Sequence, residues 1–222
     1  MWLGLDRGHY FASSVWKSDS LLPLHIELAR DHDAKVRLFA LTHLDLAMRL
    51  GNAELLPVMR RHLDDEDAEC RFIAAYRVWW KTQDPAAKTS LLSLVDCADN
   101  HVRGNVAEAL AGMAQADQEL FEPLAKLAKD DNSRVRKWGI GAMPLFGTRA
   151  LPTIRSALDD PLSCYVAVEA ARGLGPDAVE LIPSLQAMRK DCPVWARYDL
   201  DEAMSKIDPA RFPSPGPPRR RP

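Results

Sequence analysis

One unit of sequence recurs along most of this chain, and this recurrence limits the possible folds more than any other feature. In four copies an aspartate precedes an arginine by six residues, at Asp31/Arg37, Asp65/Arg71, Asp130/Arg136 and Asp191/Arg197. Two copies lack the complete pair: Cys97 precedes Arg103, and Leu158 and Cys164 occupy both positions of the fifth copy. Successive copies are 34, 32, 33, 28 and 33 residues apart. Such a period indicates a stacked array of helical units.

Every copy contains the pattern of two helices. In the second helix, the residue before the arginine position and those four and eight further on are small or apolar, as in Val36, Ala40 and Leu44. This spacing places them on one helical face. Three residues earlier stands a residue able to cap the helix N-terminus: Asp33, Asp67, Asp99, Asn132 and Asp160. The first helix is shorter and apolar, with a proline near its start, as in LLPVMRRHL.

The sequence therefore predicts an all-α, right-handed α-solenoid of about six helical hairpins over residues 20–208. Residues 1–19 lack the repeat but contain Trp2, Tyr10, Phe11 and Trp16, which favours a helix that caps the first unit. Residues 209–222 are rich in proline and arginine, which predicts a disordered or polyproline-like tail.

Composition narrows the class of protein. The formal net charge of −2 argues against a chain built mainly to bind nucleic-acid phosphates or anionic lipid. The four cysteines form no CxxC pair, which indicates reduced thiols and a cytoplasmic location. No apolar run approaches the roughly 18 residues of a membrane span. The six histidines form no zinc-binding motif, so we expect neither a metal nor a cofactor.

The leading proline, the turn aspartate and the Val-Arg pair resemble the HEAT repeat family, particularly the short HEAT-like units of phycobilin lyase relatives. The matching residues are Pro57, Asp65 and Arg71, together with the stretch NHVRGNVAEALAGM. The resemblance covers Ser20 to Asp208. It implies a solenoid of helix pairs whose second helices line a concave face.

The aspartate lies in the turn between the helices and the arginine one turn into the second helix, so the two can pair within a unit or with the next unit. A line of such pairs would satisfy turn amides and fix the angle between units. We predict a structural ladder, not a catalytic set, and looser or differently angled stacking where the third and fifth pairs are incomplete. Its members are Asp31, Arg37, Asp65, Arg71, Arg103, Asp130, Arg136, Asp191 and Arg197.

The second helices also carry residues that point away from the core face. In the second repeat Phe72, Tyr76 and Trp79 share one side of the helix, with Trp80 adjacent. Exposed aromatic residues are typical of interface hot spots, although the same spacing also occurs in cores. The predicted partner-binding residues are Phe72, Tyr76, Trp79, Lys137, Trp138, Tyr165, Glu169, Tyr198 and Glu202. Acidic residues gather late on this face, at Glu108, Glu169, Asp199, Asp201 and Glu202, where a solvated face suited to a basic or polar partner is favoured over acid–base catalysis.

No phosphate loop or GxSxG elbow is present, and no histidine is followed by glutamate as in the HEAT-like deoxyhypusine hydroxylase. We therefore predict a non-enzymatic scaffold that binds a protein partner through its concave, aromatic-rich helix face. The alternative is a HEAT-like DNA alkylpurine glycosylase or DNA-binding repair protein, because YRVWWKTQD and VRKWG supply tryptophan and arginine of the kind such enzymes use. The resemblance also leaves bilin lyase activity open.

Overall fold

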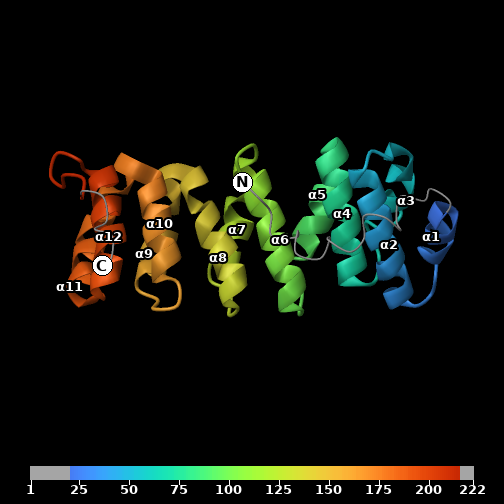
Figure 1. The fold of residues 1–222 in the computed structure, drawn as a ribbon, viewed down its shortest axis with the longest axis horizontal. Coiled ribbons are helices and arrows are strands. Elements are labelled where there is room, and N and C mark those ends of the chain that lie inside the picture. The colour runs from blue at the N-terminus through green and yellow to red at the C-terminus, as the bar shows by residue number, and fades with distance from the viewer. Residues whose placement is uncertain (1–20, 216–222) are drawn as a thin grey trace, which may run out of the picture. The chain divides into compact units, whose positions relative to one another are not determined.

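The computed structural model describes residues 21–215, and within that range it contains helices and no strands (Figure 1). The α-helices are α1 (Leu22–Leu28), α2 (Ala34–Arg49), α3 (Leu56–Arg60), α4 (Ala68–Thr82), α5 (Pro85–Ser93), α6 (Asn100–Met113), α7 (Phe121–Leu127), α8 (Ser133–Ala142), α9 (Leu151–Leu158), α10 (Cys164–Leu174), α11 (Ile182–Asp191) and α12 (Val194–Ile207). Short 3-10 segments span Ala53–Leu55, Gln118–Leu120, Met143–Ala150 and Gly175–Leu181. The predicted all-α class is confirmed.

The helices alternate between a first and a second helix of each repeat, as the period predicts. The chain forms two compact units that divide after Leu91. In the first unit α1 packs on α2, α3 packs on α4, and α2 lies against α4. In the second unit α8 lies between α6 and α10, α10 contacts α12, and the first helices α7, α9 and α11 cover their partners. The second helices thus form a continuous row within each unit (Figure 1).

Four of the predicted N-caps are confirmed by hydrogen bonds from the first-turn amides. Asp33 accepts from the amide of Lys35 at 2.8 Å, and Asp67 from that of Cys70 at 2.9 Å. The carboxylate of Asp99 and the side-chain oxygen of Asn132 accept in the same way. These bonds satisfy amides that have no partner inside the helix, so each second helix begins at a set residue.

The fifth predicted cap, Asp160, also accepts from the amide two residues on, as Asp33, Asp99 and Asn132 do. Helix α10 begins at Cys164, and the residue before it, Ser163, makes no side-chain cap bond. Pro161 to Ser163 form a separate turn, in which the Asp160 carboxylate accepts from the Leu162 amide at 3.1 Å and from the Ser163 hydroxyl at 2.6 Å. The regular α-helix therefore starts only after this turn.

Small residues bring the helices of a hairpin close together, most of all at Gly139 of α8. A Cβ atom added there would lie 2.4 Å from the backbone nitrogen of Ala128 and 2.7 Å from the carbonyl carbon of Leu127. Real Cβ atoms do not approach backbone this closely, so α7 and α8 can pack as they do only because residue 139 has no side chain.

The two ends of the chain lie partly or wholly outside the described residues. The predicted capping helix at residues 1–19 lies outside the described residues, as do residues 216–222. Between 209 and 215 the chain is turn and irregular structure. None of the helices within residues 21–215 is long and apolar enough to cross a bilayer.

We expect Gly139→Ala to destabilise the protein by about 2 kcal/mol or more, because the methyl group overlaps backbone atoms that cannot move aside. Urea unfolding followed by circular dichroism measures this. The matched control is Gly141→Ala in the same helix, where an added Cβ has nothing within 4 Å. That change should stabilise the protein by roughly 0.5–1 kcal/mol through helix propensity. Equal effects of the two substitutions would contradict the close helix approach.

Candidate functional site

A chain of arginine contacts joins successive repeats at the turn between their helices. The Arg37 guanidinium donates to both carboxylate oxygens of Asp65 in the next repeat, at 3.0 and 2.7 Å. Its remaining nitrogen donates to the backbone carbonyls of Asp31 and His32, both at 3.0 Å. The spacing of six therefore reflects a bond to the backbone of the repeat's own turn, while the charge pairs with the following turn. Bidentate contacts of this kind are geometrically specific.

The same arrangement recurs in the second unit. Arg103 donates to both oxygens of Asp130 at 2.8 and 2.9 Å, and to the carbonyls of Cys97 and Ala98 at 2.9 and 3.0 Å. A further bond reaches the exposed carboxylate of Asp131 at 2.8 Å. Cys97 thus serves through its backbone, although it supplies no carboxylate.

Where Leu158 replaces the aspartate, other groups take its place. The Arg136 guanidinium donates to the Ser163 hydroxyl at 2.9 Å and lies 3.6 Å from the Asp160 carboxylate. It also bonds the carbonyl of Asp130 at 2.8 Å. The turn before α10 therefore supplies the missing acceptors.

The remaining ladder residues are not joined in this way. Within the described residues, the Nε atoms of Arg71 and Arg197 are buried without a hydrogen-bond partner. Arg71 does donate to the backbone carbonyl of Asp65. Asp31, in the first repeat, accepts from the amide of Asp33 at 2.8 Å. The carboxylate of Asp191 makes no hydrogen bond or ion pair among residues 21–215.

The ladder carboxylates are strongly perturbed acids. Burial alone would raise the pKa of Asp65, but hydrogen bonds from Arg37, His62 and the Asp67 amide outweigh it and lower the pKa to about 2. His62 contributes through its Nδ1, which lies 2.9 Å from the carboxylate. The hydrogen bond from Arg103 is the main reason that the pKa of Asp130 also falls to about 2. Both side chains are therefore charged over the whole physiological range.

A row of aromatic rings follows the outer side of α4. Phe72 and Tyr76 stack with ring centroids 5.7 Å apart, and Trp80 meets Tyr76 edge-on at 6.1 Å. Trp80 is 48% exposed, whereas Trp79 is half-buried. The ring contacts thus continue through Trp80, a spacing of four and four residues. The sequence placed Trp79 on this face, although Trp80 completes the row; we call Phe72, Tyr76 and Trp80 the aromatic row.

The neighbouring helix α2 adds an aromatic residue that sequence reasoning missed. Phe39 is 49% exposed, and its ring lies 4.3 Å from that of His43, which stacks on the buried His25 at 4.8 Å. Burial lowers the pKa of His25, and the nearby His43 adds to this effect. Phe39 occupies one of the outward positions of the second helix, so the periodicity itself could have found it.

A buried ion pair ties α2 to α4 beneath this surface. The side chain of Arg77 is 9% exposed and bonds the Asp45 carboxylate, which also accepts from Arg49 at 3.0 Å. Cys70, at the start of α4, is buried with its sulfur 3.6 Å from the Ala34 carbonyl, and burial raises the pKa of its thiol to about 12. All four cysteines are free thiols.

In the second unit the predicted partner-binding residues differ in exposure. Lys137 and Tyr165 are exposed, and Trp138 and Tyr198 are half-buried. The structure therefore does not gather them into one aromatic surface like that of α4. Arg136, on which a glycosylase would rely together with Trp138, has its guanidinium engaged in the ladder.

The acidic residues of this face are mostly committed to neighbouring arginines. Glu169 and Glu202 both bind Arg172, the latter at 2.9 Å, which links α10 to α12. Asp201 binds Arg189 with a second contact at 2.9 Å. These three carboxylates bind arginines of the last helices, so fewer acidic residues than predicted are free to meet a partner.

Glu108 has a separate environment in α6. Its side chain is buried, with one oxygen lacking a hydrogen-bond partner among the described residues and the other 3.7 Å from Arg134. Burial raises its pKa, and the nearby Arg134 opposes this rise. The carboxylate therefore does not reach solvent as the sequence suggested.

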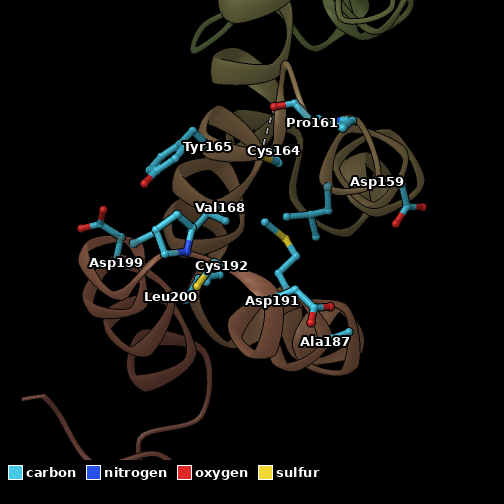
Figure 2. Close-up of a pocket in the computed structure, with 14 residues that line it drawn as sticks. Asp159, Pro161, Cys164, Tyr165, Val168, Ala187, Asp191, Cys192, Asp199 and Leu200 are labelled. Carbon is cyan, nitrogen blue, oxygen red and sulfur yellow. Dashed lines mark hydrogen bonds between the residues drawn. The ribbon is translucent and has the colours of Figure 1, made fainter.

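A pocket of about 550 Å³ lies between the fifth and sixth repeats (Figure 2). It is bounded by the ends of α9 and α11 and the beginnings of α10 and α12. Its residues are Leu158, Asp159, Pro161, Cys164, Tyr165, Val168, Ala187, Met188, Asp191, Cys192, Pro193, Ala196, Asp199 and Leu200. Most of the wall is apolar, and the charged residues in it are all aspartates. Of the predicted binding residues, Tyr165 is the one that lines it. Sequence reasoning missed this pocket, although the Leu158/Cys164 replacement was its signal.

Within residues 21–215, no cluster of three or more His, Cys, Asp or Glu side chains could hold a metal ion. The perturbed acids Asp65 and Asp130 are paired with arginines in the ladder, where they serve packing.

Tandem helical hairpins joined by an arginine ladder define an α-solenoid of the repeat-protein class. A family model for HEAT repeats matches residues 21–111 and again 89–175, and the chain belongs to the HEAT-repeat family. No curated protein sequence matches the chain.

Several solved structures share the fold. A designed armadillo repeat protein in complex with the peptide (KR)4 is 18% identical, with a TM-score of 0.66, covering 84% of this chain and 99% of that chain. Computationally designed armadillo repeat proteins for modular peptide recognition are 20% identical, with a TM-score of 0.64 and coverages of 84% and 100%. A chain in the complex of CpcE and CpcF of phycocyanin lyase from Nostoc sp. PCC7120 is 17% identical, with a TM-score of 0.55. The match covers 70% of this chain and 66% of that chain. At these identities the likeness is one of fold.

We expect Asp130→Asn to lower the free energy of unfolding at pH 7 by about 2 kcal/mol. Folding lowers the pKa of Asp130 from 3.8 to about 2. Its contribution is therefore complete above about pH 4 and is lost as the pH falls from there towards 2. Urea unfolding of both proteins at a series of pH values between 7 and 3 should show the difference shrinking only below about pH 4.

The neighbouring substitution Asp131→Asn is the control. Its carboxylate also contacts Arg103 but is 89% exposed, so the change should be within about 0.5 kcal/mol. A loss as large as that of Asp130→Asn would show that the ladder geometry does not determine stability.

Proposed function

We propose that this protein is a non-enzymatic scaffold that binds an extended segment of a partner protein along the outward faces of its second helices. The observation that carries the proposal is the aromatic row on α4. A Trp side chain that is 48% exposed, in ring contact with Tyr76 and backed by Phe72, is a large apolar surface at a helix face. Surfaces of this composition are typical of binding hot spots.

The row is also well prepared for binding. Each ring is held by its neighbour, and Arg77 beneath Tyr76 is fixed by Asp45, with its guanidinium carbon 6.0 Å from the ring centroid. Side chains that are already ordered lose little conformational entropy when a partner binds. The designed armadillo proteins that share the fold include one in complex with a peptide and others made for modular peptide recognition. Their likeness supports an extended peptide as the kind of ligand.

The test is selection from a random peptide library displayed on phage, using the full-length protein. Peptides recovered on the wild-type protein should bind Trp80→Ala and Tyr76→Ala at least tenfold more weakly by titration calorimetry, since loss of a hot-spot residue costs ~2 kcal/mol or more. Circular dichroism checks that the variants remain folded.

Leu24→Ala serves as the control, because Leu24 is 52% exposed but belongs to a first helix. Its affinities should match the wild type. Peptides that bind the aromatic variants as tightly as the wild type would overturn the proposal.

A further inference from the structure

The pocket between the fifth and sixth repeats lies where the ladder has lost its arginine. The backbone shows the equivalence, because the amide of each ladder residue donates to the carbonyl four residues earlier. Arg103 donates to Asp99 at 3.0 Å and Arg136 to Asn132 at 3.0 Å. Cys164 donates to Asp160 at 2.8 Å. Cys164 is therefore the residue of α10 from which a ladder guanidinium would extend.

The carboxylate that such a guanidinium would reach is present. Asp191 follows the pattern of Asp65 and Asp130, two positions before the residue that precedes the second helix. Those two aspartates also accept from the amide two residues on, at 2.9 Å in each case. In the sixth repeat that position is Pro193, which has no N–H to donate. Asp191 has thus lost both partners, and among the described residues its carboxylate has no other.

The space left behind has the chemistry of a site for a cation with an apolar stem. Its volume of about 550 Å³ lies within the range of small-ligand sites, roughly 300–1,000 Å³. Leu158, Val168 and Leu200 give it apolar walls, and Tyr165 stands at its edge across from Asp159 (Figure 2). Its charged residues are Asp159, Asp191 and Asp199, with no lysine or arginine in the described lining.

We propose that this pocket binds an arginine side chain of the partner segment, whose guanidinium replaces the missing ladder arginine opposite Asp191. The inference rests on the proposed function for the origin of the arginine, and it adds the chemistry that the partner must supply. Arginine fits better than lysine, because a planar guanidinium can make a bidentate bond to a carboxylate and stack on an aromatic ring, while its methylenes contact apolar walls. Lysine offers a compact and strongly hydrated charge.

The experiment uses three capped tripeptides, Gly-Arg-Gly, Gly-Lys-Gly and Gly-citrulline-Gly, added to the full-length protein with methyl-labelled methionine. The Met188 methyl signal in NMR spectra reports binding, since Met188 lines the pocket. The arginine peptide should shift this signal with an affinity at least about tenfold above that of the neutral citrulline peptide, as expected for a charge-assisted pair. The lysine peptide should bind between them.

Asp191→Asn should reduce arginine-peptide binding at least about tenfold, whereas Asp177→Asn, an exposed aspartate of the 175–181 segment, should leave it unchanged. Cys164→Arg should fill the site from within the chain, abolish arginine-peptide binding and raise the melting temperature. If that variant does not fold, Asp191→Asn still decides the question. Equal binding of all three peptides, no Met188 shift, or full binding by Asp191→Asn would overturn the inference.

Failure here is separable from failure of the proposed function. The aromatic row lies in the first compact unit and this pocket in the second. Selected peptides that depend on Trp80 but ignore Asp191 would leave the scaffold and remove the arginine site. Arginine binding with no selectable peptide would do the reverse.

Discussion

The arginine ladder is the interaction on which the described structure depends. Each ladder guanidinium bonds the carbonyls of its own inter-helix turn and the carboxylate of the next turn. It therefore fixes the position of one turn relative to the next. Arg37 and Arg103 both do this with two-pronged geometry. A charge buried in this way would be costly if it lacked any of its partners, so the turn, the cap and the next repeat must form together. The ionic contacts thus specify the relation between neighbouring hairpins, while the apolar faces supply most of the burial.

The ladder also shows how a repeat protein tolerates change. In the turn that follows Arg136, Leu158 stands at the aspartate position, and the Ser163 hydroxyl and the Asp160 carboxylate take over the role of the missing carboxylate. At Cys164 the arginine itself is missing, and no side chain of the described chain replaces it. After the first change the neighbouring turns are still joined by a hydrogen bond, whereas the second change leaves a pocket between the repeats. The chain divides into its two compact units within the third repeat, whose aspartate position is Cys97.

Much of the fold could be predicted from the sequence, because period, caps and apolar spacing are local signals. Asp33, Asp67, Asp99, Asn132 and Asp160 all accept from first-turn amides as predicted, whereas the late start of α10 is not visible in the repeat alignment. The direction of ladder pairing was open between two choices, because spacing along the chain does not tell which turn a guanidinium will reach. Exposure was hardest to predict. Trp79 and Trp80 are adjacent in sequence, but only the packing of α4 against its neighbours selects Trp80 for the ring contacts, and Glu108 is buried on a face expected to be solvated.

The buried thiol of Cys70 can report the separation of α2 from α4. Its thiol lies against the Ala34 carbonyl of the preceding second helix, with no solvent exposure and a pKa of about 12. A disulfide reagent needs an accessible thiolate, so we expect Cys70 to react only when α2 and α4 separate. Cys164 and Cys192 line the pocket between the fifth and sixth repeats and are partly accessible in the folded protein. The delay between modification of Cys164 and Cys192 and modification of Cys70 therefore measures how rarely α2 and α4 separate.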